Sequence, residues 1–394
     1  MHLIAQFLSK LIEGADLTIM SDVFIVDAIR TPIGRGRSDG ALHDVHPVDL
    51  LAKTLEALMA HSGVDQSQVE DIVAGCVTAH GEQGTNIGRL AGLKARFPVE
   101  VPAVQLNRFC GSGQQAIHFA AQAIAAGDMD MAIGCGVESM SRVPMGSDAA
   151  ITEEFRAGFP CQLLHQGVSA EMIAAKWGVG RGELDEFAAQ SHCRAAAAQR
   201  EGWTRREIFT INALEFDEGV RENPDLAKMR ALKPVFKSDG VITAANSSQI
   251  SDGAAAVLLA SGRKADRLGL RKRARIVARA VVGSDPELML TGPIPATQKA
   301  LAMAGLRLED IDVFEINEAF AAVPLVWARE IRPSMDRLNI QGGAIAHGHP
   351  LGATGAVLMT KLVNILERTG GRYGLQSMCI GFGMATATIL ECLN

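Results

Sequence analysis

The chain has 394 residues, 48% of them hydrophobic and only 5% aromatic, and a formal net charge of −6. The scarcity of aromatic residues and the negative charge argue against a nucleic-acid partner, which requires basic grooves and stacking rings. The length suits two or three domains or one duplicated α/β body. No apolar run approaches the ~20 residues that cross a bilayer, so we expect no membrane insertion.

The distribution of cysteines and the composition of the N-terminal residues indicate in which cellular compartment the protein is expected. The seven cysteines are scattered and include no Cys-x-x-Cys pair, which disfavours disulfides or structural zinc and favours a reducing compartment. Residues 1–20 form an expected N-terminal extension that contains Lys10 and acidic residues but no arginine, unlike a secretory signal or a transit peptide. We therefore expect a cytoplasmic protein, with Met20 as an alternative start.

Strands and helices alternate in the first part of the chain. In chain order we expect a strand at 23–26 closed by the turn 30–34, a helix at 49–61, a strand at 71–76, a helix at 114–126 and a core strand at 131–133. The last of these strands should end in Gly134-Cys135-Gly136. This alternation predicts a mostly parallel sheet that is covered on both faces.

The composition changes at about residue 142, where prolines, methionines and charged residues mix and a helix is expected at 182–200. Core-like sequence returns at 252–259, and a second alternation opens at Ala274. It includes a strand at 313–316, a helix at 353–368 and a strand at 377–380. We expect an N-terminal half at 21–141 plus 241–268, an inserted loop domain at 142–240 and a C-terminal half at 269–394.

Two segments resemble each other and suggest a duplication. Val69-Glu70-Asp71-Ile72 and Leu308-Glu309-Asp310-Ile311 differ by 308 − 69 = 239 positions, and 110 + 239 = 349 sets Cys110 opposite His349. A second match, Ile133-Gly134-Cys135-Gly136 with Ile380-Gly381-Phe382-Gly383, has an offset of 247. A thiol and an imidazole that meet between two halves are the usual groups of covalent acyl transfer.

Cys110 lies just before the expected helix at 114–126. The free amides and the dipole of a helix N-terminus would stabilise a thiolate, so we expect a lowered pKa for this thiol. A buried, inert cysteine is the alternative. His349 lies in a tight Gly-His-Pro turn. His347 and His349 could also bind a metal, but no third ligand lies at a suitable spacing, so we expect no metal site.

Cys379 and Asn317 each follow or end a predicted strand. Cys379 terminates the strand at 377–380 and faces a glycine loop, although a core cysteine is the alternative. Asn317 lies at the carboxyl end of the strand at 313–316, where α/β proteins form their sites. A simple helix N-cap by Asn317 is the other interpretation.

These segments together resemble the thiolases, the acyl-CoA acyltransferases that make or cleave 3-ketoacyl-CoA. The matches run in the family's order over nearly the whole chain, at 30–34, 107–113, 134–141, 246–248 with 251–255, 317–321, 342–355 and 379–381. The resemblance implies an α/β fold of two βαβαβ-type halves packed as α-β-α-β-α layers with an inserted loop domain. It also implies a homodimer or homotetramer that uses coenzyme A and acyl-CoA as substrates, needs no cofactor and serves fatty acid β-oxidation.

The resemblance also implies roles for individual residues. Cys110 would be the acylated nucleophile, His349 its base, Cys379 the thiol that exchanges a proton with the α-carbon, and Asn317 the holder of a water at the thioester oxygen. The amides of Cys110 and Gly381 would form an oxyanion site. Contacts with substrate or coenzyme A are implied for Ser248, Arg221, His165 and Phe320.

The chain departs from the family at three positions. Gln341 stands where asparagine is usual, and Gln166 stands where short-chain members carry methionine. Phe382 interrupts a glycine-rich stretch and should reshape the pocket near Cys379. Two alternatives stay open: a ketoacyl synthase-like condensing enzyme, against which Cys379 argues, and a non-catalytic acyl-CoA binding protein of the same fold.

Overall fold

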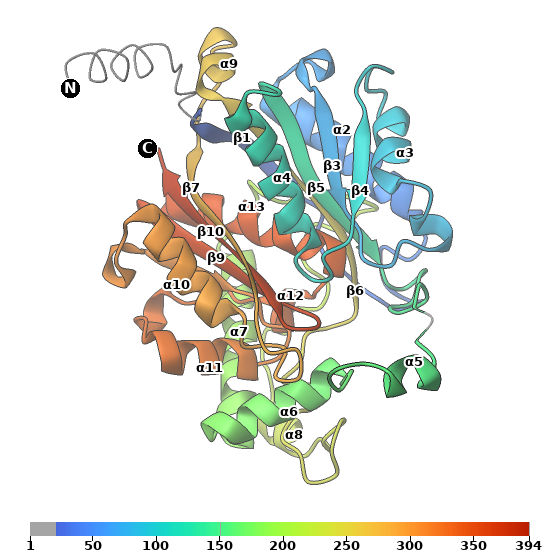
Figure 1. Ribbon diagram of the computed structural model, residues 1–394, viewed down its shortest axis with the longest axis vertical. Helices are drawn as coiled ribbons and strands as arrows, with labels where there is room; N and C mark the ends of the chain where they lie inside the picture. The colour runs from blue at the N-terminus through green and yellow to red at the C-terminus, as the bar shows by residue number, and fades with distance from the viewer. Residues whose placement is uncertain (1–20, 150, 394) are drawn as a thin grey trace, which may run out of the picture.

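The computed structural model describes residues 21–149 and 151–393 (Figure 1). The expected N-terminal extension and Met20 lie outside these ranges. The first part of the chain contains β1 Val23–Arg30, β2 Gly34–Arg35, α2 Pro47–Ser62, β3 Asp71–Gly75, α3 Ile87–Lys94, β4 Ala103–Leu106, α4 Ser112–Ala126 and β5 Met131–Ser139. The last part contains β6 Ser251–Ser261, α9 Gly262–Arg267, β7 Ala274–Gly283, α10 Pro293–Ala304, β8 Val313–Ile316, α11 Ala322–Ile331, α12 Ala344–His347, α13 Leu351–Thr369, β9 Tyr373–Ile380 and β10 Met384–Cys392.

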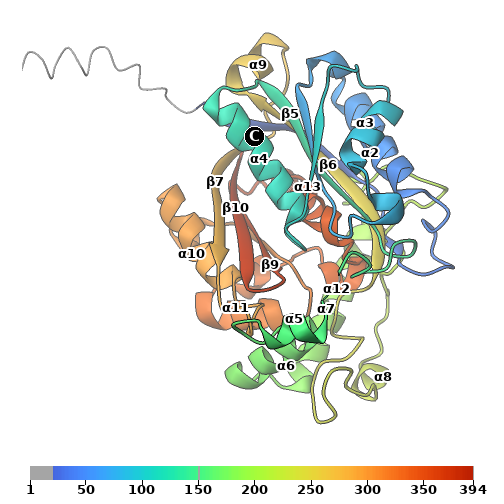
Figure 2. The same ribbon diagram turned by 45° about the vertical axis from the view of Figure 1, so that its right-hand side comes forward.

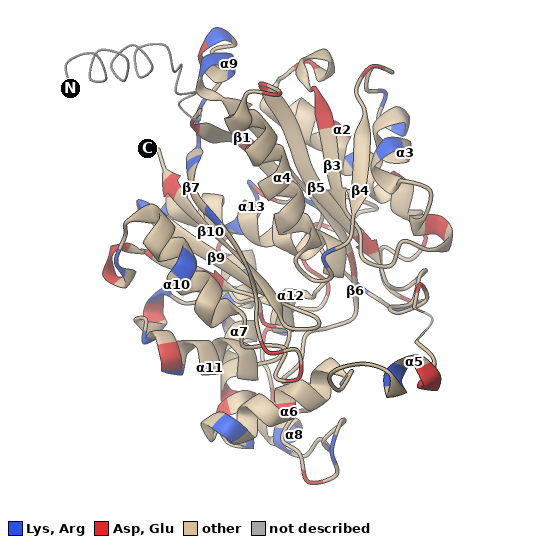
Figure 3. Ribbon diagram, in the orientation of Figure 1, with Lys and Arg blue, Asp and Glu red and all other residues tan. Residues whose placement is uncertain are grey.

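Local sequence explains where the main helices begin and end. α2 starts at Pro47, whose fixed φ suits a first helical turn, and stops at Gly63 in the left-handed conformation. α4 runs through an alanine-rich stretch that carries no Lys, Arg, Asp or Glu (Figure 3), and it stops at Gly127 with φ +87°. The predictions of helices at 49–61 and 114–126 are confirmed.

The ten strands of the described chain form one hydrogen-bonded sheet in the order β4-β3-β5-β6-β1-β7-β10-β9-β8, with β2 beside β6. Only the pairs β3–β4, β3–β5 and β8–β9 are parallel within it. The prediction of a mostly parallel sheet is therefore wrong. β10 follows β9 through a short turn at 381–383, and β6 returns from the insertion, so both run antiparallel to their neighbours.

Two halves meet around the helices α4 and α13 (Figures 1 and 2). β1 and β7 join the halves through only two residue pairs, Phe24 with Arg275 and Ile25 with Ala274. α13 contacts β5 and β6 of the first half and β8 and β9 of the second, and it also packs on α4. With α2 and α3 outside the first half and α10 outside the second, the expected α-β-α-β-α layers are confirmed.

The structure corrects the two offsets of the repeat. Asp71 pairs with Ala132 in one half, and Val313 pairs with Gly374 in the other, so the strands correspond at 313 − 71 = 242. The offsets of 239 and 247 are wrong for the strands. α4 and α13 nevertheless begin at Ser112 and Leu351, and 351 − 112 = 239 preserves the correspondence of Cys110 with His349.

Gly134-Cys135-Gly136 does not end its strand, contrary to prediction, because β5 continues to Ser139. The two glycines allow helices to approach the sheet closely. A Cβ at Gly134 would lie 2.6 Å from the Cα of Ile117 in α4, and one at Gly136 would collide with the carbonyl of Gly352 in α13. Through the offset of 242, the counterpart of Cys379 is Val137 (379 − 242 = 137), whereas the offset of 247 would have given Ala132.

The segment between β5 and β6 contains α5 Glu153–Ala157, α6 Gln166–Trp177, α7 Arg181–Arg200 and α8 Leu226–Arg230. Buried Arg30, the last residue of β1, anchors this segment through ion pairs of 2.7 Å with Glu207 and with Asp217. Within the described residues, no helix is both long and apolar enough to cross a membrane.

Candidate active site

Cys110 is held by a tightly bonded loop between β4 and α4. The Asn107 side chain accepts a hydrogen bond from the backbone N–H of Phe109 at 2.7 Å. The Ser112 hydroxyl accepts from the N–H of Arg108 at 2.8 Å and donates to the carbonyl of Phe109 at 2.7 Å. Phe109 takes a left-handed backbone with φ +45°. These bonds fix Cys110 two residues before α4, with 3% of its surface exposed.

The environment of Cys110 opposes ionisation of the resting thiol. Burial raises the pKa of Cys110 to about 11, although its own amide, the Gln166 side chain and the amide of Gly381 act in the other direction. The expected lowered pKa is therefore wrong. Cys110, ahead of the helix N-terminus that motivated this expectation, is buried among apolar residues of both halves, such as Met140, Leu351 and Ile380. Desolvation of the charged form therefore outweighs the donors.

His349 occupies the corresponding loop before α13. Its N–H donates to the Ser251 hydroxyl at 3.0 Å, and its Nδ1 lies 2.7 Å from the Thr354 hydroxyl. Because that hydroxyl donates its own hydrogen to the carbonyl of Pro350 at 2.8 Å, it must accept from Nδ1–H. Nε2 is then the nitrogen with a free lone pair. Burial lowers the pKa of His349 to about 4, so the ring is a neutral base.

Asn317 and Cys379 lie beside these two groups. The Asn317 Nδ2 is 3.4 Å from His349 Nε2, while its buried Oδ1 has no hydrogen-bond partner within the described chain. Cys379 is 1% exposed near the end of β9. Burial and the neighbouring Cys110 raise the pKa of Cys379, and a hydrogen bond from Asn317 acts in the opposite direction. The structure thus brings together all four predicted catalytic residues.

A cavity of about 720 Å³ opens onto Cys110 and His349. The predicted contact residues Ser248, His165 and Phe320 line it, and so does Gly381, which was predicted to form the oxyanion site. Arg221 is not part of this wall; it is exposed, and its backbone N–H donates to Nδ1 of His192 at 3.2 Å. Most other lining side chains are apolar: Val77, Phe109, Met140, Met145, Ile151, Leu164, Phe236, Ile250, Met289, Leu351 and Phe382. Such a wall suits an acyl chain or a pantetheine arm.

The insertion forms one side of the cavity. His165 caps α6, since its Nδ1 accepts the N–H of Gly167 at 3.1 Å. Its ring stacks on Phe236 with centroids 5.0 Å apart, and Phe236 meets Phe320 edge to face at 6.0 Å. Phe320, from the predicted segment 317–321, thus contacts Phe236 of the insertion, and Phe236 in turn contacts His165.

The three residues that depart from the family pattern do not all lie at the cavity. Gln166 and Phe382 line the cavity next to Gly381. Gln341 lies outside the cavity wall, 3% exposed, and its Oε1 has no hydrogen-bond partner among the described residues. His347 is buried beside His349, and its Nδ1 lies 3.0 Å from the carbonyl of Gly348. No group of three potential metal ligands occurs in residues 21–149 and 151–393.

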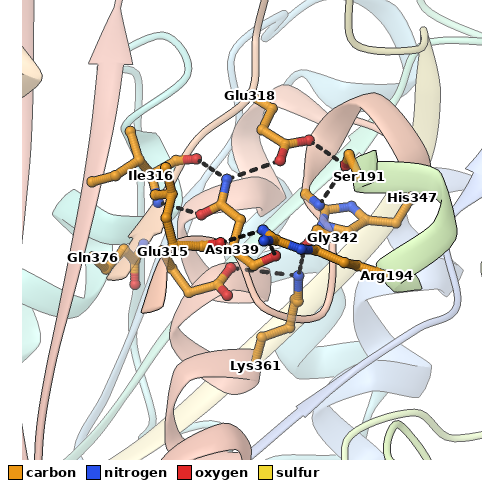
Figure 4. A network of polar contacts seen from close by, with 12 residues as sticks. Ser191, Arg194, Glu315, Ile316, Glu318, Asn339, Gly342, His347, Lys361 and Gln376 are labelled. Carbon is orange, nitrogen blue, oxygen red and sulfur yellow. Dashed lines mark hydrogen bonds and ion pairs between the residues drawn. The ribbon is translucent and has the colours of Figure 1, made fainter. Parts of the chain in front are cut away.

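A buried polar network supports the chain that leads to His349 (Figure 4). The carboxylate of Glu318 accepts from Ser191 at 2.6 Å, from Asn339 at 2.9 Å and from the N–H of Ile345 at 3.2 Å. Lys361 donates to the carbonyl of Gly342 at 2.5 Å. Because Ser191 belongs to α7, the insertion also holds α12.

Sequence reasoning missed two supporting residues. Thr354 orients the His349 ring. The sequence feature that could have revealed it is a hydroxyl four residues after Pro350, at the start of a helix. Glu138 accepts bonds from the N–H groups of Val77 at 2.9 Å and Gly352 at 2.8 Å. It thereby ties the loop after β3 to the first turn of α13. Only the tertiary structure reveals the role of Glu138, since its partners lie far apart in sequence.

Comparisons with known proteins agree with this geometry. The family model described as "Thiolase, N-terminal domain" matches residues 23–263, and "Thiolase, C-terminal domain" matches 270–392. The chain is 47% identical to the steroid 3-ketoacyl-CoA thiolase FadA6 of Mycobacterium tuberculosis, with 95% of each protein covered. It is 43% identical to a 3-ketoacyl-CoA thiolase of Vibrio cholerae, over 94% of this chain and 100% of the relative.

A solved structure is also similar. Human mitochondrial 3-ketoacyl-CoA thiolase in complex with CoA superposes with a TM-score of 0.88 at 35% identity, over 95% of this chain and 99% of that one.

Proposed function

The chain belongs to the thiolase family, and on this premise we propose that it cleaves 3-ketoacyl-CoA with coenzyme A into acetyl-CoA and a shortened acyl-CoA. The reverse Claisen condensation uses the same groups. The observation that carries the proposal is the cavity where Cys110 of one half and His349 of the other lie together with Asn317 and Cys379 behind them.

The first half-reaction forms an acyl-enzyme. His349 Nε2 takes the proton of Cys110, and the sulfur attacks the keto carbon of the substrate. The amides of Cys110 and Gly381 donate to the developing oxyanion. The bond between the keto carbon and the α-carbon then breaks, and its electron pair passes to the enolate of acetyl-CoA. Cys379 donates its proton to that carbon, which leaves acyl-Cys110, protonated His349 and the thiolate of Cys379.

The second half-reaction returns every proton. The thiolate of Cys379 takes the proton of incoming coenzyme A, whose sulfur attacks the acyl group on Cys110. The released thiolate of Cys110 regains its proton from His349. Asn317 holds a water at the thioester oxygen through the buried Oδ1 that lacks a protein partner among the described residues. The thioester energy is kept for acyl transfer because the mostly apolar wall of the cavity shields acyl-Cys110 from bulk water.

Binding of the substrate uses both halves and the insertion. Ser248, His165 and Phe320 contact the pantetheine and thioester end. We assign Arg221 to the phosphates of coenzyme A, which exposed guanidinium groups bind well. On the same premise we propose that residues 142–240 act as the loop domain between the halves 21–141 plus 241–268 and 269–394. We also propose a cytoplasmic homodimer or homotetramer that needs no cofactor beyond its substrates.

The experiment compares wild type with Cys110→Ala and with Cys193→Ala, which removes an exposed cysteine that does not line the cavity. Wild type and Cys193→Ala should form acyl-CoA from 3-ketoacyl-CoA and coenzyme A and should carry an acyl adduct on Cys110 by mass spectrometry. Cys110→Ala should do neither. Full activity in Cys110→Ala would overturn the proposal, and activity that depends on a malonyl thioester would favour the condensing-enzyme alternative.

A further inference from the structure

Gln166 is the first residue of α6 and extends from the insertion toward the nucleophile. Its side-chain Nε2 lies 3.1 Å from the point that a Cβ on Gly381 would occupy. Gln166, Gly381 and Cys110 together line the same wall of the cavity. A hydrogen bond from the Gln166 side chain lowers the pKa of Cys110 against the larger effect of burial. The amide therefore faces the sulfur.

The backbone that carries Gln166 is firmly held. The preceding His165 caps the helix and stacks on Phe236. The following Gly167 packs so closely on the Phe236 ring that a Cβ would overlap it. One turn further, the hydroxyl of Ser169 donates to the carbonyl of Glu287 at 2.7 Å. A side chain on such a support keeps its direction, which a preorganised site requires.

We propose that the side-chain amide of Gln166 is a further catalytic group, which donates a hydrogen bond to the sulfur of Cys110 whenever that sulfur is a thiolate. The thiolate forms twice in the cycle: when His349 takes the proton, and when coenzyme A displaces the acyl group. In both states the N–H of Gln166 stabilises negative charge beside the backbone N–H of Gly381. The amide neither gains nor loses a proton.

This role distinguishes the chain from relatives with methionine at the same position. A thioether has nearly the same length as a glutamine side chain, but it has no hydrogen to donate. With methionine, the thiolate would rely on backbone amides alone. Here the insertion contributes a donor of its own, so the segment that surrounds the substrate also adjusts the reactivity of the nucleophile.

The inference rests on the proposed function, because it takes Cys110 as the nucleophile. Its test measures the sulfur directly, without turnover. Iodoacetamide alkylation of Cys110 is followed by peptide mass spectrometry from pH 7 to pH 9.5 in wild type, Gln166→Met and Gln166→Glu. Gln162→Met is the matched control, because Gln162 is exposed on the segment before the same helix. Thermal melting establishes that each variant is folded.

At each pH, Gln166→Met should alkylate about tenfold more slowly than wild type, the effect expected for one lost hydrogen bond to a charged group. Gln166→Glu should be slower still, because a carboxylate repels the thiolate. Gln162→Met should match wild type. If folded Gln166→Met alkylates at the wild-type rate, the proposed donor is wrong, even where its KM for substrate has changed. A wild-type enzyme that forms no acyl-Cys110 would instead overturn the proposed function, which separates the two failures.

Discussion

The rings of Phe109 and Phe382 meet edge to face, with centroids 5.3 Å apart and planes inclined by 67°. Each ring belongs to a different half, and each residue adjoins one of the two amides at the sulfur, those of Cys110 and Gly381. Both residues also have left-handed backbones, with φ of +45° and +59°. A left-handed phenylalanine costs about 1–2 kcal/mol, and such strain concentrates at functional sites. We interpret the pair as a wall that shapes the acyl side of the cavity.

Two substitutions of Phe382 should separate the apolar contact of its ring from the strain of its left-handed backbone. Phe382→Ala and Phe382→Gly both delete the ring and should lower kcat/KM for longer 3-ketoacyl chains by about tenfold, because apolar contact is lost. The kcat/KM for acetoacetyl-CoA should fall less. Only glycine adopts the left-handed backbone without strain. The free energy of unfolding in urea should therefore be about 1 kcal/mol higher for Phe382→Gly than for Phe382→Ala. Equal stability of the two variants would show that the left-handed turn is not strained.

The pH dependence of acylation should reflect a resting enzyme in which the Cys110 thiol and the His349 imidazole are both neutral. Burial raises the pKa of Cys110 to about 11 and lowers that of His349 to about 4, because it disfavours both charged forms. Between these values the thiol keeps its proton and the imidazole remains a base. Single-turnover acylation of Cys110 should therefore vary little from about pH 6 to pH 8 and decline only as His349 becomes protonated in more acidic buffer. An acid limb centred near pH 6.5 would indicate an ordinary histidine and contradict this reading.

The sequence was sufficient for some features because they depend on local signals. The limits of α2 and α4 and the strand before Asn317 follow from turns, caps and breakers along the chain. Other features depend on distant contacts. Gly134 and Gly136 look like a strand end, but they lie within a strand because helices pack on them. The direction of β6 depends on how the insertion returns, and the pKa of Cys110 depends on what buries it.

Thr354 offers a test of how His349 is oriented. Its hydroxyl accepts from Nδ1–H and leaves Nε2 free, while a valine of the same shape cannot accept. In Thr354→Val the buried Nδ1–H loses its partner, so the ring should shift or exchange tautomers. We expect kcat to fall by about tenfold, the effect of an unpaired buried donor, with little change in KM because Thr354 does not line the cavity.

Thr360→Val is the matched control for that variant. Thr360 also donates its hydroxyl to a carbonyl four residues earlier in α13, that of Ala356 at 2.9 Å, and it is also buried. The helix therefore loses the same kind of bond in both variants, but only Thr354→Val affects His349. Comparable melting temperatures with a kcat loss confined to Thr354→Val would establish Thr354 as a positioning residue. If the two variants lose kcat equally, the hydroxyl acts through the stability of the helix, and the imidazole of His349 must obtain its orientation from Asn317 instead.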